Sequence, residues 1–217
     1  MLKFIQIGSL ALLLSHPVFA APAPKSSLQE VKPQMNEHFK KAGPKAGSDA
    51  PDFELENARG GTLCASALWA KKPVIIFTGS YSCPQFRETT AGRLELFWEF
   101  SDRVEFIIIY TMEAHPKGSD SPYVQGEFLT KANVAEGVLI DQPKTYEGRV
   151  QRAKETRKTL KLVSDIAVDT MDNATWKKYG SSPNCGYLIG TDGKVVLQQG
   201  LFDANEMRAA LVKLVGK

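Results

Sequence analysis

Two short, strongly apolar runs stand out in the pattern of hydrophobic and polar positions, at residues 74–77 and 104–110. Such runs are typical of strands that are buried on both faces of a sheet. Between them, apolar residues recur at roughly helical spacing over 84–101, and Pro84 suits the first turn of a helix, where its missing N–H is no loss. The order strand, helix, strand requires parallel pairing through a right-handed crossover.

The rest of the chain predicts shorter elements around these two strands. A long polar segment at 111–126 precedes a charged surface helix, and a hairpin and an amphipathic helix close the chain. The combination predicts an α/β fold with a mixed central sheet and helices on both faces. The other expected strands are 53–56, 62–64, 166–169, 187–189 and 195–198, and the other expected helices are 144–161, 172–179 with Asp172 as its cap, and 203–215.

The first twenty residues have the layout of a secretory signal peptide. Lys3 is followed by an apolar run over 5–14, a helix-breaking segment, and Val18 and Ala20 at the positions where cleavage requires small residues. The apolar run is too short to span a bilayer comfortably. We expect cleavage near Ala20/Ala21 and a periplasmic or secreted chain with no stable membrane span. An uncleaved anchor or a buried helix is the alternative.

Composition limits the remaining organisation. Residues 21–47 are rich in Pro, Lys, Ser and Gly, which predicts a flexible arm with a short helix at 35–41 and little contribution to the core. Residues 48–217 are the predicted folded domain. Of the 217 residues, 43% are hydrophobic and 24% charged, which suits one packed domain. The formal net charge of +3 gives no reason to expect nucleic acid as a partner.

Cys83 is the leading candidate for chemistry. It lies between a buried strand and a helix, where free N–H groups and the helix dipole stabilise a thiolate. The turn at Gly79 and Ser80 presents it at the carboxyl ends of the strands, where open α/β sheets place their sites. A buried, unreactive cysteine is the alternative. The chain has three cysteines, so at least one thiol stays unpaired, and Cys64 is expected to be a small buried residue.

His115 follows the second apolar strand in the run Glu113-Ala114-His115-Pro116. Because adjacent parallel strands end at the same edge of a sheet, we expect His115 to approach Cys83. There it acts as a proton donor or thiolate partner, with Glu113 orienting its ring. A surface histidine in a loop is the alternative.

Several other kinds of site are excluded by spacing. Phe86 and Arg87 occupy the third and fourth positions after Cys83, so neither a C-x-x-C dithiol nor a C-x-x-x-C copper site is present. One cysteine and one histidine are too few for a closed zinc site. No glycine-rich phosphate loop and no G-x-S-x-G elbow occurs. We therefore expect no bound cofactor or metal.

Residues 79–84 and 109–116 resemble the two core motifs of the iodothyronine deiodinases. Residues 168–173 and the segment from Pro183 to the closing helix continue the match, so the resemblance covers about 72–215. It implies a thioredoxin-like fold of the redoxin superfamily. It also implies an activity, the reductive removal of iodine from thyroid hormones.

The same resemblance implies roles for single residues. Cys83 stands at the position of the family's selenocysteine nucleophile, and Glu113 and His115 match active-site residues. The Cys83 thiolate would attack iodine, the ring carbon would gain a proton through His115, and a second thiol would reduce the sulfur–iodine intermediate. The chain departs from the family at Tyr81, where animal members often carry a second cysteine, and around 141–143, where a further family histidine has no counterpart.

In thioredoxin-like folds a cis proline at the place of Pro183 lies against the reactive cysteine. If Pro183 is cis, Cys185 lies near Cys83 and is a candidate resolving thiol, which would close a disulfide after Cys83 is oxidised. A structural strand cysteine is the alternative, because a small change of register would turn Cys185 to the other face.

Four functions stay open from the sequence. The first is a deiodinase-like reductive dehalogenase acting on an aryl halide. The second is a peroxiredoxin-like thiol peroxidase, for which Ser80 matches that family's Thr or Ser and Ile76 departs from its proline. The third is a thiol–disulfide oxidoreductase, and the fourth is a non-enzymatic binding module. Expected partners are a small-molecule substrate or peroxide and a thiol reductant or redox partner protein, and a homodimer stays open.

Overall fold

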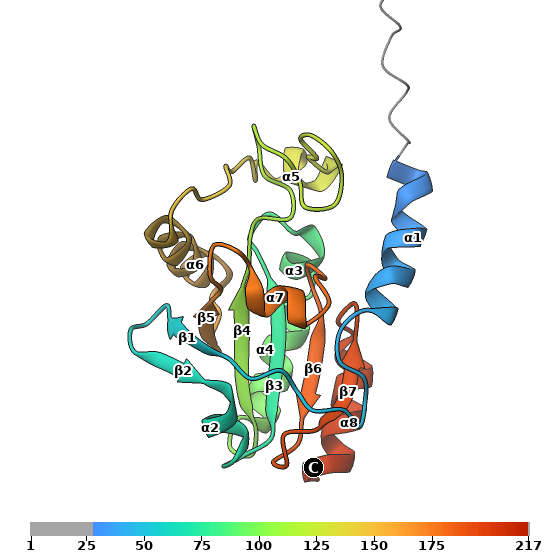
Figure 1. The fold of residues 1–217 in the computed structure, drawn as a ribbon, viewed down its shortest axis with the longest axis vertical. Helices are drawn as coiled ribbons and strands as arrows, with labels where there is room; N and C mark the ends of the chain where they lie inside the picture. The colour runs from blue at the N-terminus through green and yellow to red at the C-terminus, as the bar shows by residue number, and fades with distance from the viewer. Residues whose placement is uncertain (1–27, 217) are drawn as a thin grey trace, which may run out of the picture.

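The computed structural model of the chain describes residues 28–216, so the predicted signal peptide and the arm up to residue 27 lie outside the described residues. A seven-stranded mixed sheet runs in the order β2-β1-β5-β4-β3-β6-β7 (Figure 1). The strands are β1 Glu54–Asn57, β2 Thr62–Cys64, β3 Val74–Gly79, β4 Glu105–Tyr110, β5 Asp165–Val168, β6 Gly186–Ile189 and β7 Val195–Gln199.

β3 and β4 are parallel, as the order of the two apolar runs and the helix between them predicted, and β5 pairs with β4 in the same direction. β1 joins β5 and β6 joins β3 in antiparallel pairs, and β2 and β7 complete the two outer hairpins. Every residue of β3 is buried, because helices cover both faces of the sheet at its centre. The predicted α/β fold with a mixed central sheet is confirmed.

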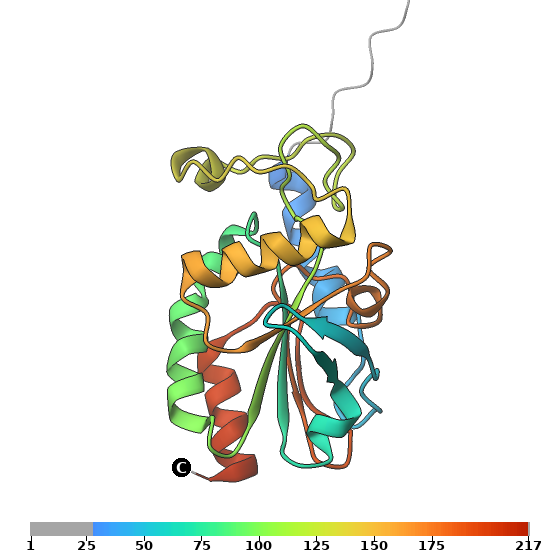
Figure 2. The same ribbon diagram turned by 90° about the vertical axis from the view of Figure 1, so that its left-hand side faces the viewer.

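The sheet divides the core into two layers, with helices on both of its faces (Figure 2). The helices are α1 Leu28–Lys41, α2 Ala65–Trp69, α3 Pro84–Glu88, α4 Thr90–Phe100, α5 Lys131–Ala135, α6 Tyr146–Leu160, α7 Ala174–Lys178 and α8 Ala204–Val215. On the face covered by α4, α6 and α8, Ile75 and Phe77 of β3 pack with apolar residues of these helices. On the other face, Val74 and Ile76 pack with Trp69 of α2 and the β1–β2 hairpin. Successive side chains of β3 therefore pack into the core layers on opposite faces of the sheet.

The helix expected over 84–101 is broken at Thr89 into α3 and α4. The Thr89 hydroxyl donates to the carbonyl of Gln85 at 2.6 Å, and the Thr90 hydroxyl donates to that of Phe86 at 3.0 Å. Side-chain hydroxyls that bond the preceding turn compete with the helical ladder. The helical spacing of apolar residues carries no sign of this interruption.

The expectation that Asp172 caps the helix at 172–179 is wrong. The helix starts later, as α7, after Asn173 in the left-handed conformation with φ 57°. The cap is Asp169, whose carboxylate accepts the N–H groups of Thr175 at 3.2 Å and Trp176 at 2.8 Å. Asp169 is fully buried at the end of β5, so it joins strand to helix.

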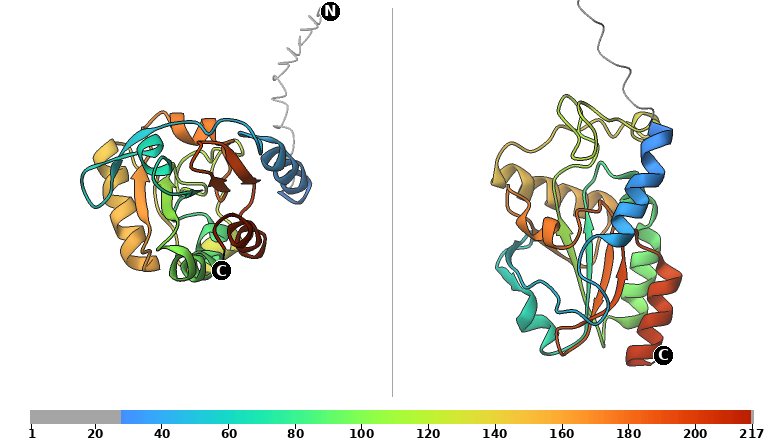
Figure 3. Two further views of the ribbon diagram at one scale, coloured as in Figure 1. Left: turned by 90° about the horizontal axis from the view of Figure 1, so that it is seen from below. Right: turned by 45° about the vertical axis from the view of Figure 1, so that its right-hand side comes forward.

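The described part of the predicted arm is not detached from the domain. α1 stands beside the β7 edge of the sheet (Figure 3), and the Gln198 side chain donates to three carbonyls between Phe39 and Ala42. Phe39 is buried and meets the ring of Tyr123 edge-on, with ring centroids 5.6 Å apart. The expected small contribution to the core is therefore wrong for Phe39. No helix in the described part of the chain is both long and apolar enough to cross a membrane.

Replacing Asp169 with alanine leaves two buried N–H groups of α7 without an acceptor. We expect the free energy of unfolding to fall by about 1–3 kcal/mol, measured by urea denaturation followed by tryptophan fluorescence. Asp172→Ala is the matched control and should cost clearly less, because Asp172 is exposed. Equal losses in the two variants would contradict the assignment of the cap to Asp169.

Candidate active site

Cys83 lies directly before α3, at the end of the turn that follows β3. Its N–H donates to the carbonyl of Ser80 at 3.2 Å, which closes the turn. Gly79 is required here, because a Cβ at this position would run into the ring of Phe86. The structure thus places Cys83 at the carboxyl ends of the parallel strands, as predicted.

The cysteine loop is hydrogen-bonded to the segment that follows β4. The hydroxyl of Ser80 accepts the N–H of Ala114 at 3.1 Å, and the hydroxyl of Ser82 accepts the N–H of His115 at 3.0 Å. The Glu113 carboxylate accepts the N–H of Ser82 at 2.8 Å. The two sequence motifs therefore form one rigid unit.

Glu113 supports this unit through the backbone of the cysteine loop. The expectation that Glu113 orients the ring of His115 is wrong. Glu113 is fully buried, and Tyr110 donates its hydroxyl to the second carboxylate oxygen at 2.5 Å. The Tyr110 oxygen also accepts the N–H of Tyr81 at 3.1 Å. Burial, followed by the neighbouring Glu113 charge, raises the pKa of Tyr110 well above its usual value, so the phenol stays protonated.

The orientation of the His115 ring comes from a different loop. Its Nδ1 lies 3.0 Å from the carbonyl oxygen of Phe128, and the two rings meet edge-on at 4.5 Å. Because a carbonyl only accepts, Nδ1 carries the proton and Nε2 is left as the basic nitrogen. Burial lowers the pKa of His115 to about 4, so the imidazole is neutral at pH 7.

Burial dominates the acidity of Cys83. The residue is 2% exposed, and desolvation raises the pKa of its thiol to about 11. The N–H groups of Phe86 and Gln85 and the charges of Arg93 and Arg87 lower this pKa by less. The expectation of a thiolate held by the helix N-terminus is therefore wrong for the resting protein, in which Cys83 is a neutral thiol.

Cys83, His115 and Pro183 line one pocket of about 500 Å³. Its other walls are mainly apolar and come from α1, α3, α5 and the loop between β4 and α5. These walls are formed by Met35, Phe39, Tyr123, Phe128 and Leu129, with Pro84 and Ala132, and polar groups are supplied by Asn36, Gln85, Glu88, Thr130 and Lys131. Ser80 and Glu113 are not among the lining residues and support the loop from behind.

Cys185 is not placed as a partner of Cys83. No described peptide bond is cis, so the bond before Pro183 is trans. Cys185 belongs to the core layer on the opposite face of the sheet, where its sulfur lies 3.0 Å from the Thr78 hydroxyl. All three cysteines are free thiols, and Cys64, half-buried, lies beside Ser66.

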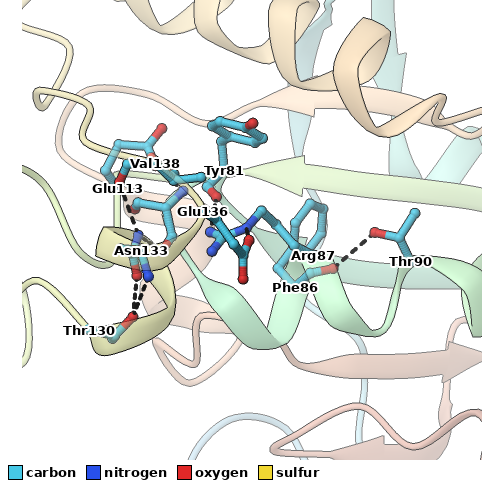
Figure 4. A network of polar contacts seen from close by, with 10 residues as sticks. Tyr81, Phe86, Arg87, Thr90, Glu113, Thr130, Asn133, Glu136 and Val138 are labelled. Atoms are coloured by element: carbon cyan, nitrogen blue, oxygen red, sulfur yellow. Dashed lines mark hydrogen bonds and ion pairs between the residues drawn. The ribbon is translucent and has the colours of Figure 1, made fainter.

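Further contacts hold the cysteine loop, and no sequence motif marks the residues that make them (Figure 4). The Asn133 amide donates to the carbonyl of Ser82 at 2.8 Å, and the Arg87 guanidinium donates to that of Tyr81 at 2.7 Å. Arg87 also pairs with Glu136 at 3.0 Å, so the segment around α5 is fastened to α3. Among the described residues, no cluster of three or more His, Cys, Asp or Glu side chains could hold a metal ion.

The mixed sheet and the cysteine at a strand-to-helix turn define a thioredoxin-like protein. The fold is similar to that of a thiol:disulfide interchange protein from Bacteroides sp., with a TM-score of 0.55 and 13% identity over 80% of this chain and 92% of that chain. It is also similar to the thioredoxin domain of a thiol-disulfide oxidoreductase from Bacteroides vulgatus, with a TM-score of 0.51 and 14% identity over 76% and 96% of the two chains.

The family is more specific than the fold. Residues 25–214 match the model of the family described as iodothyronine deiodinase, and the chain belongs to this family. It is 28% identical to the thyroxine 5-deiodinase of Sparus aurata over 71% of this chain and 54% of the relative. It is 29% identical to that of Gallus gallus over 77% and 60%. The chain thus spans little more than half of the length of these relatives.

The raised pKa of Cys83 gives a direct prediction for alkylation by iodoacetamide. Because the thiolate is the reactive form, the rate at Cys83 should rise about tenfold per pH unit and continue to rise past pH 10. Mass spectrometry of the Cys83 peptide measures it. The same residue in urea-unfolded protein is the control and should level off near pH 9. A plateau at pH 7–8 in the folded protein would show a stabilised thiolate instead.

Proposed function

We propose that the protein is an exported thiol oxidoreductase that removes halogen reductively from an aryl halide, with Cys83 as the nucleophile. The observation that carries this proposal is the pocket, in which Cys83 and His115 face a mainly apolar and aromatic wall. Membership of the deiodinase family supports the reaction type. The predicted signal peptide supports export to the periplasm or beyond, with a thiol or a redox protein there as the reductant.

The proposed reaction begins with a proton transfer. The basic Nε2 of neutral His115 takes the proton of the Cys83 thiol, and the thiolate attacks the halogen. The carbon–halogen bond breaks, the ring carbon gains the proton from His115, and Cys83 carries a sulfur–halogen bond. One external thiol displaces halide and forms a mixed disulfide with Cys83. A second external thiol then releases the Cys83 thiol and leaves as a disulfide.

Glu113 and Phe128 support the reaction by fixing the positions of the reacting groups. Glu113 fixes the cysteine loop through the N–H of Ser82, and Phe128 fixes the tautomer of His115. Cys185 takes no part in this scheme. External thiols complete the turnover, so a resolving cysteine within the chain is not required.

Peroxide reduction and disulfide exchange are the competing chemistries. Ser80, which matches a peroxidase motif, uses its hydroxyl to accept a backbone N–H and does not line the pocket. Phe86, at the position where a dithiol motif has its second cysteine, is fully buried. Neither observation favours peroxide reduction or disulfide exchange. Both chemistries become the next assays if the iodide experiment below fails.

Iodide release tests the proposal. The reduced protein, beginning at Ala21, is mixed with an iodothyronine and a dithiol, and iodide is measured. Cys83→Ser should abolish release, and His115→Gln should lower kcat by about 10²–10⁴, because proton transfer loses its base. Cys64→Ser is the control and should leave the rate unchanged. No release from a protein whose Cys83 is reduced and alkylatable would overturn the proposal and direct the assay to peroxide and protein disulfides.

The aromatic wall gives a second test. Phe39→Ala removes a ring from the pocket, and we expect KM for an aryl halide to rise about tenfold with little change in kcat. Lys41→Ala on the exposed side of α1 is the matched control. An unchanged KM in Phe39→Ala would mean that the substrate does not reach the α1 side of the pocket.

A further inference from the structure

Arg93, on α4, is a buried cation that the described reaction scheme does not use. It is 2% exposed and ranks among the largest fully buried side chains. Ion pairs elsewhere in the described chain join arginines and lysines to carboxylates, but no carboxylate of the described residues pairs with Arg93. Burying a charge without a counter-ion costs free energy of folding, so the position of Arg93 needs an explanation.

Three aromatic rings and two oxygens hold the guanidinium in place. Its central carbon lies 4.4 Å from the ring centroid of Phe86, 4.9 Å from that of Phe202 and 5.1 Å from that of Phe77. It donates to the Phe86 carbonyl at 2.9 Å and to the Asn184 side-chain oxygen. Its Nε is buried without a partner. The guanidinium is therefore fixed in place, and its Nε–H has no acceptor.

This cage lies next to the reactive cysteine. Phe86 is the third residue after Cys83, and Cys83 belongs to the same buried cluster as Phe77, Phe86 and Phe202. Asn184 directly follows Pro183, which lines the pocket. Arg93 thus bonds to both segments that flank Cys83, behind the reacting side of the pocket.

We propose that Arg93 is the counter-ion of the Cys83 thiolate and is kept unpaired in the resting protein for that purpose. The inference rests on the proposed role of Cys83 as a nucleophile. When the thiol loses its proton to His115, a negative charge forms where water is excluded, and the fixed guanidinium balances it. Arg93 is a positioning residue that acts through Cys83.

The other titratable groups around Cys83 do not supply a lasting positive charge. His115 is neutral before the transfer and loses its charge again when it protonates the ring carbon, and Tyr123 and Cys185 have pKa values raised by burial and are also neutral. Arg87 is the one other cation that lowers the pKa of Cys83, and it is already paired with Glu136. Arg93 also lowers the pKa of Cys83, against the effect of burial.

The test is the pH profile of Cys83 alkylation in variants of the chain beginning at Ala21. In Arg93→Met the alkylation rate at pH 8, where only a small fraction of Cys83 is thiolate, should fall about tenfold or more. Arg93→Lys keeps the charge and should recover most of the rate. Arg103→Met removes another arginine stacked on a phenylalanine, remote from Cys83, and should leave the profile unchanged.

Folding of each variant is checked by thermal unfolding. If Arg93→Met does not fold, Arg93→Gln takes its place, because glutamine keeps a donor for the two oxygens and loses the charge. An unshifted profile in either folded, uncharged variant overturns the proposal. Alkylation needs no turnover, so a shifted profile together with absent iodide release would reject the dehalogenase function and keep the role of Arg93.

Discussion

The candidate site depends on one buried carboxylate. Glu113 accepts the N–H of Ser82 on one side and the hydroxyl of Tyr110 on the other, and it lies where two parallel strands end. Its backbone exchanges two hydrogen bonds with the side chain of Gln142, which ties a third segment to the same point. The position of Cys83 relative to His115 is therefore fixed by a residue that touches neither reacting side chain.

Burial gives the two reacting groups their resting state. It raises the pKa of Cys83 to about 11 and lowers that of His115 to about 4, so both are neutral over the whole range between these values. A proton passed from sulfur to imidazole creates two opposite charges in a site of low polarity, where they attract strongly. The same low polarity disfavours each charge on its own, so a thiolate is absent at rest and forms only when the proton is transferred.

Much of the fold follows from local patterns in the sequence. β3 and β4 were predictable because burial on both faces requires an unbroken apolar run, and the meeting of Cys83 and His115 follows from parallel pairing. Features that depend on distant partners were not predictable. The docking of Phe39 on Tyr123 is such a contact and leaves no periodic signal. The cap at Asp169 is local, but it reaches over six and seven residues, which is longer than the usual spacing of a helix cap. The protonated state of Cys83 at rest follows from its burial in the folded chain. The local sequence motif showed only that Cys83 lies at a helix N-terminus, which would favour a thiolate.

The docking of α1 bears on how this protein should be divided for study. A chain shortened to residues 48–217 retains every strand and the cysteine loop, yet it lacks the side of the pocket formed by Met35 and Phe39. Such a fragment would present a wider, more open cavity than the parent chain. Ligand screens on a minimal redox domain would then select compounds for a shape that the longer protein does not offer.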